Sequence, residues 1–447
     1  MSNRPETNKQ SCPVYKKCGG CQLQNLSYPE QLEFKQRKVE KLLKRFCTVE
    51  KIIGMKTPYH YRNKVQAAFY TDKKGKIISG VYQSGSHHVV GIDSCQTEDV
   101  IADKIIVAVR KLLPSFRMTT YNEDTGKGFL RHILVKRGFA TNQIMLVLVT
   151  GTPVFPSKNN FVKAILKQFP EITTIVQNIN PYRTNLVLGD NQKVLYGKGY
   201  IEDILCGCRF RISPKSFYQI NPVQTEVLYG KAIEFANLKG NETVLDTYCG
   251  IGTIGIIAAK NGAGNVIGAE LNGDAVRDAI VNARANNLKN IRFYKADAGE
   301  FMREAADEDE KPDVVFMDPP RAGSDRKFLD SLIKMSPKKV VYVSCNPETL
   351  ARDLAYLTQN SPYKAQKIQP VDMFPHTAHI ETVVKLVKKT PDTYIDITVD
   401  MDELDLTASE AKATYEEIKQ YILDKYDTKV SNLYICLLYT SPSPRDS

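Results

Sequence analysis

Residues 243–270 read TVLDTYCGIGTIGIIAAKNGAGNVIGAE. The first apolar run ends in Asp246, glycine-bearing residues follow it, and IGTIGIIAAKNG is typical of a helix. The next apolar run ends in Glu270, about 20 residues on, where an acid can accept hydrogen bonds from ribose hydroxyls. Since strand, glycine loop, helix and strand form the unit of a doubly wound α/β sheet, this stretch decides the fold.

The strand–helix alternation continues to the carboxyl side. Residues 273–288 have a helical pattern, and IRFYKAD, DVVFMDPP and KVVYVSCNP are further strands, the first of which ends in Asp297. The glycine spacing is not GxGxxG, and no Lys/Ser pair offers a phosphate grip. Three acids at successive strand ends therefore favour a phosphate-free nucleoside, such as S-adenosylmethionine, over a pyrophosphate.

Two later motifs carry candidate chemistry. Cys345 follows the strand VVYV in a turn, at the edge where such folds bind ligands. An inert buried thiol is the commoner fate of a free cysteine, but the turn position favours a nucleophile, whose pKa we expect the site to lower. The stretch DMFPHTAHIE ends in Glu381. It lacks the HExxH zinc arrangement, and Pro375 opposes a helix, so a carboxylate base is favoured over a metal.

Taken in order, these segments resemble the RNA (uracil-5-)-methyltransferase family. The resemblance rests on DTYCGIG, DPPRAG, SCNP and DMFPHTAHIE, with KSFYQINP before them, and extends over residues 12–388. It implies a Rossmann-like class I methyltransferase domain that uses S-adenosylmethionine. It places Cys345 at the nucleophile and Glu381 at the proton-abstracting base. The positions that it assigns to cofactor or substrate contacts are Gln219, Tyr248, Glu270, Asp297 and Asp318.

The implied reaction follows from the chemistry of uracil. Carbon C5 is a poor nucleophile until the Cys345 thiolate adds to C6. The activated C5 then takes the methyl group, Glu381 removes the C5 proton, and elimination frees Cys345. Because the thiol is buried, the target base must be flipped out or unpaired.

Three of the ten cysteines lie close together in the sequence, as Cys12, Cys18 and Cys21, and Cys95 follows far downstream. Four thiolates suit either zinc or an iron–sulfur cluster. The family resemblance implies a [4Fe-4S] cluster, because ribosomal-RNA members carry it on this pattern and transfer-RNA members generally lack it. It thereby implies 23S ribosomal RNA as the substrate. We expect the cluster to serve folding or RNA docking.

These patterns predict five segments. Residues 1–50 form a cysteine-rich iron–sulfur segment with an amphipathic helix at 29–46, and residues 51–212 form a mixed, β-rich RNA-binding domain that includes Cys95. The methyltransferase domain spans 213–390. An acidic accessory segment spans 391–435, and 436–447, CLLYTSPSPRDS, looks like a non-native tail.

The charge is uneven. The 447-residue chain carries +11, but residues 391–426 carry −7 and 427–447 carry none, which leaves +18 on residues 1–390. A protein with this positive charge attracts polyanions such as nucleic acid, although a role in solubility would also explain the charge. The candidate phosphate contacts are Arg62, Lys64, Arg131, His132, Lys136 and Arg137.

The composition excludes several classes. With 42% apolar and 25% charged residues, the chain is not a disordered, collagen-like or coiled-coil protein. It has no apolar run of membrane length and no secretory signal, so we expect a cytoplasmic protein without a membrane partner. We also expect a monomer. Two alternatives stay open, a transfer-RNA methylase and a noncatalytic iron–sulfur RNA-binding module. The cysteine cluster disfavours the first, and Cys345, Glu381 and Asp318 together disfavour the second.

Overall fold

The computed structural model describes residues 12–83, 86, 88–184, 186–308, 310–389, 419–420 and 423–424. The chain divides into two compact units, Met1–Lys389 and Thr390–Ser447. Apart from four residues, the predicted acidic segment 391–435 and the tail 436–447 lie outside the described residues. Both sheets and the helices that cover them belong to the first unit.

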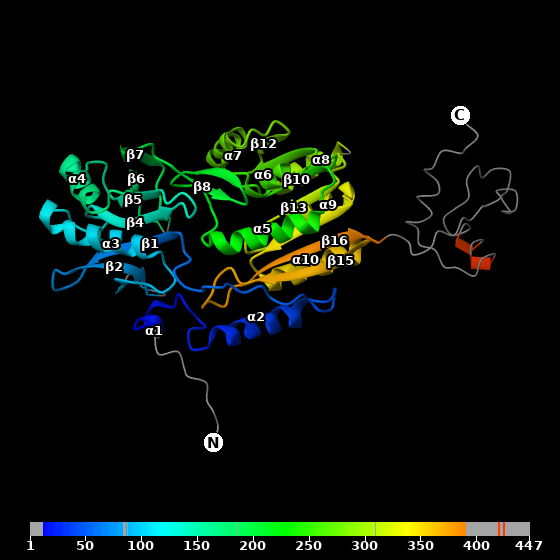
Figure 1. The fold of residues 1–447 in the computed structure, drawn as a ribbon, viewed down its shortest axis with the longest axis horizontal. Helices are drawn as coiled ribbons and strands as arrows, with labels where there is room; N and C mark the ends of the chain where they lie inside the picture. The colour runs from blue at the N-terminus through cyan, green and yellow to red at the C-terminus, as the bar shows by residue number, and fades with distance from the viewer. Residues whose placement is uncertain are drawn as a thin grey trace, which may run out of the picture. The chain divides into compact units, whose positions relative to one another are not determined.

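A seven-stranded sheet fills the first half of this unit, in the order β3-β2-β1-β4-β5-β6-β7 (Figure 1). Its strands are β1 (Lys64–Thr71), β2 (Ile77–Tyr82), β3 (Val89–Gly91), β4 (Leu130–Arg137), β5 (Ile144–Thr150), β6 (Ile172–Ile179) and β7 (Asn191–Tyr196). One face packs on α3 (Val100–Leu112), η1 (Pro114–Phe116) and α4 (Lys158–Gln168). The central strands β4 and β5 are buried along almost their whole length because the other face is covered too.

That other face joins the core of the second half. Met145, Val147 and Val176 pack in one cluster with the hairpin β8 (Ile201–Leu205) and β9 (Cys208–Ile212) and with the second sheet. The predicted segments 51–212 and 213–390 therefore share a hydrophobic core, and they form one compact unit.

The second sheet has the order β12-β11-β10-β13-β14-β16-β15. Its strands are β10 (Thr243–Asp246), β11 (Asn265–Glu270), β12 (Ile291–Lys295), β13 (Val314–Met317), β14 (Lys339–Ser344), β15 (Tyr363–Val371) and β16 (Glu381–Lys388). The strands β10 to β14 pair in parallel, whereas β16 is antiparallel to both neighbours. The helices are α5 (Pro222–Ala236), α6 (Thr253–Lys260), α7 (Gly273–Ala285), α8 (Ala298–Asp307), α9 (Arg326–Met335) and α10 (Pro347–Asn360). This is the doubly wound α/β arrangement that the sequence predicts.

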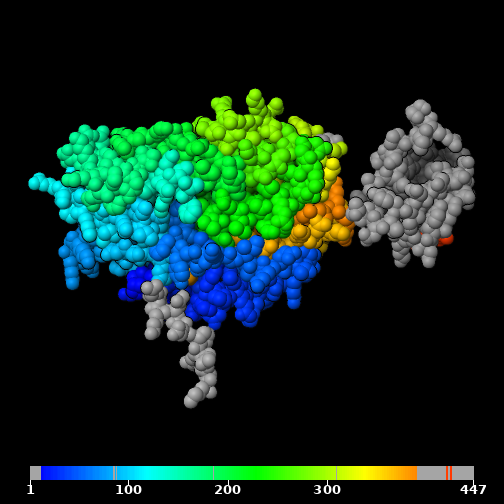
Figure 2. All heavy atoms as spheres, viewed as in Figure 1, coloured from blue at the N-terminus to red at the C-terminus, as the bar shows by residue number. Residues whose placement is uncertain are grey.

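The N-terminal segment contains α1 (Tyr15–Cys18) and α2 (Tyr28–Leu43). Helix α2 begins with a capping box in which Ser27 and Glu30 satisfy each other's amides. Its buried residues Val39 and Leu43 pack in the cluster that contains Tyr342 of the second sheet. Figure 2 shows blue atoms of the N-terminal part lying against orange atoms from late in the chain, in agreement with the contacts of α2 with α10 and β15. The helix predicted within 1–50 is therefore part of the core of the methyltransferase sheet.

Throughout the part of the chain that the structure describes, no helix combines the length and the apolar character that crossing a membrane requires.

Candidate active site

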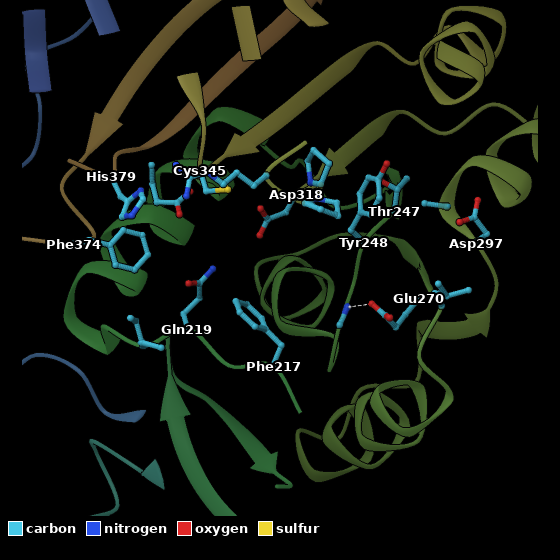
Figure 3. A pocket seen from close by; sticks show the side chains of 18 of the residues that line it. Phe217, Gln219, Thr247, Tyr248, Glu270, Asp297, Asp318, Cys345, Phe374 and His379 are labelled. Carbon is cyan, nitrogen blue, oxygen red and sulfur yellow. Dashed lines mark hydrogen bonds between the residues drawn. The ribbon is translucent and has the colours of Figure 1, made fainter. Parts of the chain in front are cut away.

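A cavity of about 720 Å³ opens at the carboxyl edge of the second sheet (Figure 3). Parallel strands end together at this edge, which is where doubly wound folds bind ligands. All seven residues that the sequence predicts for catalysis and cofactor binding line it: Gln219, Tyr248, Glu270, Asp297, Asp318, Cys345 and Glu381. The structure thus brings together segments that lie as far as 162 residues apart in the chain.

The pairing of β14 with β16 sets the positions of Cys345 and Glu381. Ser344 is paired with Thr382 across these antiparallel strands. Cys345 follows β14 and Glu381 opens β16, so the two lie at the same end of one strand pair. The nucleophile and base candidates therefore face a single cavity without depending on a flexible loop for their spacing.

The electrostatics of the thiol differ from the expectation. Burial, followed by the charges of Glu381 and Asp318, raises the pKa of Cys345 to about 11, whereas we expected the site to lower it. The Arg321 charge opposes this shift. The expectation was wrong because strand-end position reveals neither how strongly burial disfavours the thiolate nor that Glu381 and Asp318 lie near it. Burial and Asp318 also raise the pKa of Glu381 well above its ordinary value.

The loop after β10 forms another wall of the cavity. Gly250 has φ 54° and Gly252 has φ 82°, a left-handed conformation that glycine adopts without strain. The Gly250 amide donates to Glu270 Oε2 at 3.0 Å, and the Asn272 amide donates to Oε1 at 2.7 Å. Both carboxylate oxygens of Glu270, the predicted acceptor for ribose hydroxyls, therefore already hold the loop in place. Each oxygen keeps a further lone pair that can accept a hydrogen bond from a ligand.

Two other predicted contacts have structural partners as well. The Tyr248 hydroxyl lies 3.3 Å from Ser324 Oγ, and its ring packs on Phe328. The carboxylate of Asp297 caps α8 by accepting from the amides of Gly299 and Glu300. The cavity, the glycine turn and these acids fit a nucleoside cofactor such as S-adenosylmethionine in size and chemistry.

Buried polar side chains lie in and next to the cavity wall. Burial raises the pKa of Asp318 and of Asp246 to about 7 each. Tyr229, on α5, is buried and hydrogen-bonds to Gln219 and Thr253. The sequence gives no signal for Tyr229, because one tyrosine in an apolar helix reads as ordinary core.

Several cavity residues were not predicted. Phe217 and Leu271 are apolar yet 64% and 65% exposed, so they offer flat apolar surface to a ligand. Arg321, Phe374 and His379 also line the cavity. Each of these five residues lies within or directly beside a predicted motif, so its position next to that motif is the sequence feature that could have identified it as part of the cavity.

The predicted phosphate contacts are mostly wrong. Arg131 is 2% exposed, with its guanidinium on Glu123 and on backbone oxygens, and Lys136 donates to the backbone oxygens of Ser213 and Ser216 at 2.8 Å. Burial lowers the pKa of His132 to about 4, and Arg137 pairs with Asp99. The cations of Arg131, Lys136 and Arg137 have partners inside the protein, because a basic residue in a strand can serve buried carboxylates and carbonyls as readily as RNA, and His132 is buried without a charge. Two of the six are exceptions: Arg62 lines the cavity, and Lys64 is half-buried.

Among the four predicted cluster ligands, the electrostatics of Cys21 reflect the other three. Its pKa is raised to about 12 by burial and by the nearby thiols of Cys95, Cys18 and Cys12. The donor set, four thiols from two distant segments, suits a metal or iron–sulfur site in kind. Within the described ranges, however, no three His, Cys, Asp or Glu side chains are arranged so that they could hold a metal ion.

Comparisons with known proteins agree with this geometry. The sequence profile of the tRNA (Uracil-5-)-methyltransferase family matches residues 185–389. Proteins of Bacillus cereus and Clostridium tetani, each named "Uncharacterized RNA methyltransferase", are 44% and 45% identical to the chain, over 85% and 83% of this chain and 83% and 81% of theirs. The crystal structure of Pyrococcus abyssi tRNA (uracil-54, C5)-methyltransferase in complex with S-adenosyl-L-homocysteine is 31% identical, with a TM-score of 0.70, over 85% of this chain and 88% of that one.

Proposed function

Because the chain belongs to the family of S-adenosylmethionine-dependent RNA (uracil-5-)-methyltransferases, we propose that it makes 5-methyluridine in 23S ribosomal RNA through a transient bond between Cys345 and uracil C6. The observation that carries this proposal is the shared cavity. A thiol and a carboxylate on paired strands face the same space as the acids that suit a nucleoside cofactor.

The proposed chemistry uses the two residues in turn. The Cys345 thiolate forms a bond to C6, and the electron pair of the C5–C6 double bond moves toward O4 as an enolate. S-adenosylmethionine would supply the electrophilic methyl group to C5, with the methyl–sulfur bond broken and S-adenosylhomocysteine as the leaving group. The C5 proton then goes to Glu381, the C5–C6 double bond re-forms, and the C6–sulfur bond breaks to return the thiolate.

The environment of Glu381 suits proton acceptance. A buried carboxylate with a raised pKa binds a proton more strongly than an exposed one, so it is the stronger base once it is ionised. Gln219 and Asp318 line the same cavity and supply amide and carboxylate groups that can pair with the uracil edge or the cofactor. Of the predicted phosphate contacts, Arg62 lies at the cavity wall and is a candidate for holding the RNA backbone next to the flipped base.

The choice of ribosomal RNA rests on the cysteines. We propose that Cys12, Cys18, Cys21 and Cys95 hold a [4Fe-4S] cluster that folds the N-terminal segment, while no step of methyl transfer passes through it. The support is the cysteine pattern, which resembles that of ribosomal members; the described side chains by themselves are not arranged to hold a metal ion. A transfer-RNA target is the second candidate, and it is favoured by the similarity to the Pyrococcus abyssi tRNA (uracil-54, C5)-methyltransferase.

Mapping 5-methyluridine in cellular RNA tests the proposed target. A strain that lacks the gene is expected to lose 5-methyluridine at one or more positions of 23S ribosomal RNA, while transfer RNA keeps its own. Complementation with the wild-type gene restores the modification, and complementation with the Cys345→Ala gene does not. Loss confined to transfer RNA would overturn the ribosomal assignment and leave the reaction class intact.

A further inference from the structure

The connection between β15 and β16, residues 372–380, leads directly into Glu381. It carries Phe374 and His379, which line the cavity (Figure 3). Val371 and Glu381, which flank the connection, are paired with each other across the two strands, so the connection closes directly over the first residue of β16. The N-terminal segment holds the connection at several points, although the two are more than 330 residues apart in the chain.

Lys35 of α2 makes the first tie. Its side chain is 0% exposed, as is that of Asp372, and Nζ donates to Asp372 Oδ1 at 2.6 Å. The same ammonium donates to the backbone oxygen of Phe374 at 3.0 Å. The Tyr28 hydroxyl donates to the second Asp372 oxygen at 3.0 Å. A buried ammonium group is strongly destabilising unless an opposite charge and hydrogen-bond acceptors pair with it. The contact of Lys35 with Asp372 and Phe374 is therefore a specific one.

Gln31, one turn earlier on α2, makes the second tie. Its Oε1 accepts from the His376 amide at 2.8 Å, and its Nε2 lies 3.2 Å from His376 Nδ1. The opposite ring nitrogen of His376 lies 2.8 Å from the Pro58 oxygen. His376 has φ 68°, a conformation that residues with a β-carbon rarely adopt. The surrounding bonds therefore hold a strained turn in place.

Gln22 and Leu23, which directly follow Cys21, contact the same connection. The Leu23 amide donates to the His376 oxygen at 2.9 Å, and the Ala378 amide donates to Gln22 Oε1 at 3.2 Å. The connection is thus clamped by one continuous stretch of the N-terminal segment, from Gln22 to Lys35. In Figure 1 this segment runs beneath β15 and α10.

We infer that Lys35 and Gln31 are positioning residues for Glu381, so that the N-terminal helix completes an active site whose reacting groups lie on the methyltransferase sheet. This inference rests on the proposed function of Glu381. Loosening the clamp is expected to impair proton removal from C5 while leaving addition of Cys345 to C6 and methyl transfer possible. The variants should then stall as a methylated covalent protein–RNA adduct.

Three variants test this inference. Gln31→Met keeps the side-chain length without introducing a charge. The pair Lys35→Met with Asp372→Asn removes both charges, so no unpaired ion stays buried and folding is protected. Lys41→Met, on an exposed position of the same helix, is the matched control. Substrates are 23S ribosomal RNA from the deletion strain and the same sequence transcribed with 5-fluorouridine, which has no C5 proton to remove and therefore traps any enzyme that completes methyl transfer.

On 5-fluorouridine RNA, all three variants are expected to form adduct as wild type does, with unchanged S-adenosylmethionine affinity. On uridine RNA, Gln31→Met and the charge-free pair are expected to turn over about 10- to 100-fold more slowly and to accumulate adduct on a denaturing gel, whereas Lys41→Met behaves as wild type. Wild-type release of methylated RNA by the folded variants would overturn the inference. Loss of cofactor affinity or of trapping would also overturn it, because the helix would then serve only general stability. Failure of wild type itself on either RNA would instead refute the proposed function.

Discussion

Cys345 and Glu381 stand at neighbouring positions of one antiparallel strand pair, because Ser344 at the end of β14 is paired with Thr382 at the start of β16. Carbons C5 and C6 of uracil are adjacent atoms, so a nucleophile for one and a base for the other must be held at a fixed, short separation. A strand pair provides such a separation more rigidly than two loops would.

Replacing Glu381 by glutamine is expected to leave addition and methyl transfer possible and to block proton removal. The variant should accumulate a covalent protein–RNA adduct visible on a denaturing gel, with product formation reduced by about 100-fold or more. The matched control is Glu348→Gln, at the start of α10, which should release product normally. Normal product release by Glu381→Gln would assign the proton to another group.

Replacing Arg321 by methionine is expected to slow adduct formation near neutral pH. The Arg321 charge lowers the pKa of the Cys345 thiol, which is already raised to about 11, so its loss raises that pKa further and reduces the thiolate fraction. The deficit should shrink as pH rises toward the thiol pKa. Single-turnover adduct formation over a pH series measures it, with the exposed Lys327→Met as control. A deficit that stays constant with pH would mean that Arg321 acts through RNA binding alone.

Asp246 should make folding stability depend on pH. It is fully buried and its pKa is raised to about 7, so the folded protein binds this proton more tightly than the unfolded chain does. The stabilisation is complete below about pH 4 and is lost as pH rises through about 7. The melting temperature of Asp246→Asn should therefore fall less than that of wild type between about pH 5 and about pH 8. The exposed Asp190→Asn should follow wild type, and parallel curves for all three proteins would contradict the assignment.

Anaerobically purified protein is expected to be brown and to contain about four irons per chain. Cys21→Ser should lose most of the iron and the visible absorbance, because it removes one of the four proposed ligands. Cys47→Ser, outside the predicted ligand set, should retain both. Stoichiometric zinc without visible absorbance would replace the cluster with a structural zinc site.

The sequence predicts the parts of this molecule that depend on short-range pattern. Asp246, Glu270, Asp318 and Cys345 each follow or end an apolar run that stops at a polar residue, and a parallel sheet brings such strand ends to one edge. The contact between Lys35 and Asp372 could not be predicted in this way. It joins two elements 337 residues apart, and a lysine on a predicted helix reads as solvent-exposed.

The basic residues of β4 are a second case in which the sequence does not reveal the partner of a charged side chain. Charge alone predicts that Arg131 and Lys136 contact phosphate. Their partners, Glu123 and the carbonyls of Ser213 and Ser216, come from separate loops, so only the folded chain shows that these cations are satisfied internally. Charge in a sequence indicates a partner without indicating whether that partner is outside the protein or within it.

The decisive measurement identifies the residue that bonds to the base. Wild-type protein, S-adenosylmethionine and 5-fluorouridine-containing 23S ribosomal RNA are combined, the trapped complex is digested with protease and nuclease, and the modified peptide is sequenced by mass spectrometry. We predict a methylated fluorouridine nucleotide on Cys345, and no adduct with Cys345→Ala. An adduct on another residue, or an adduct that survives Cys345→Ala, would contradict the proposed mechanism.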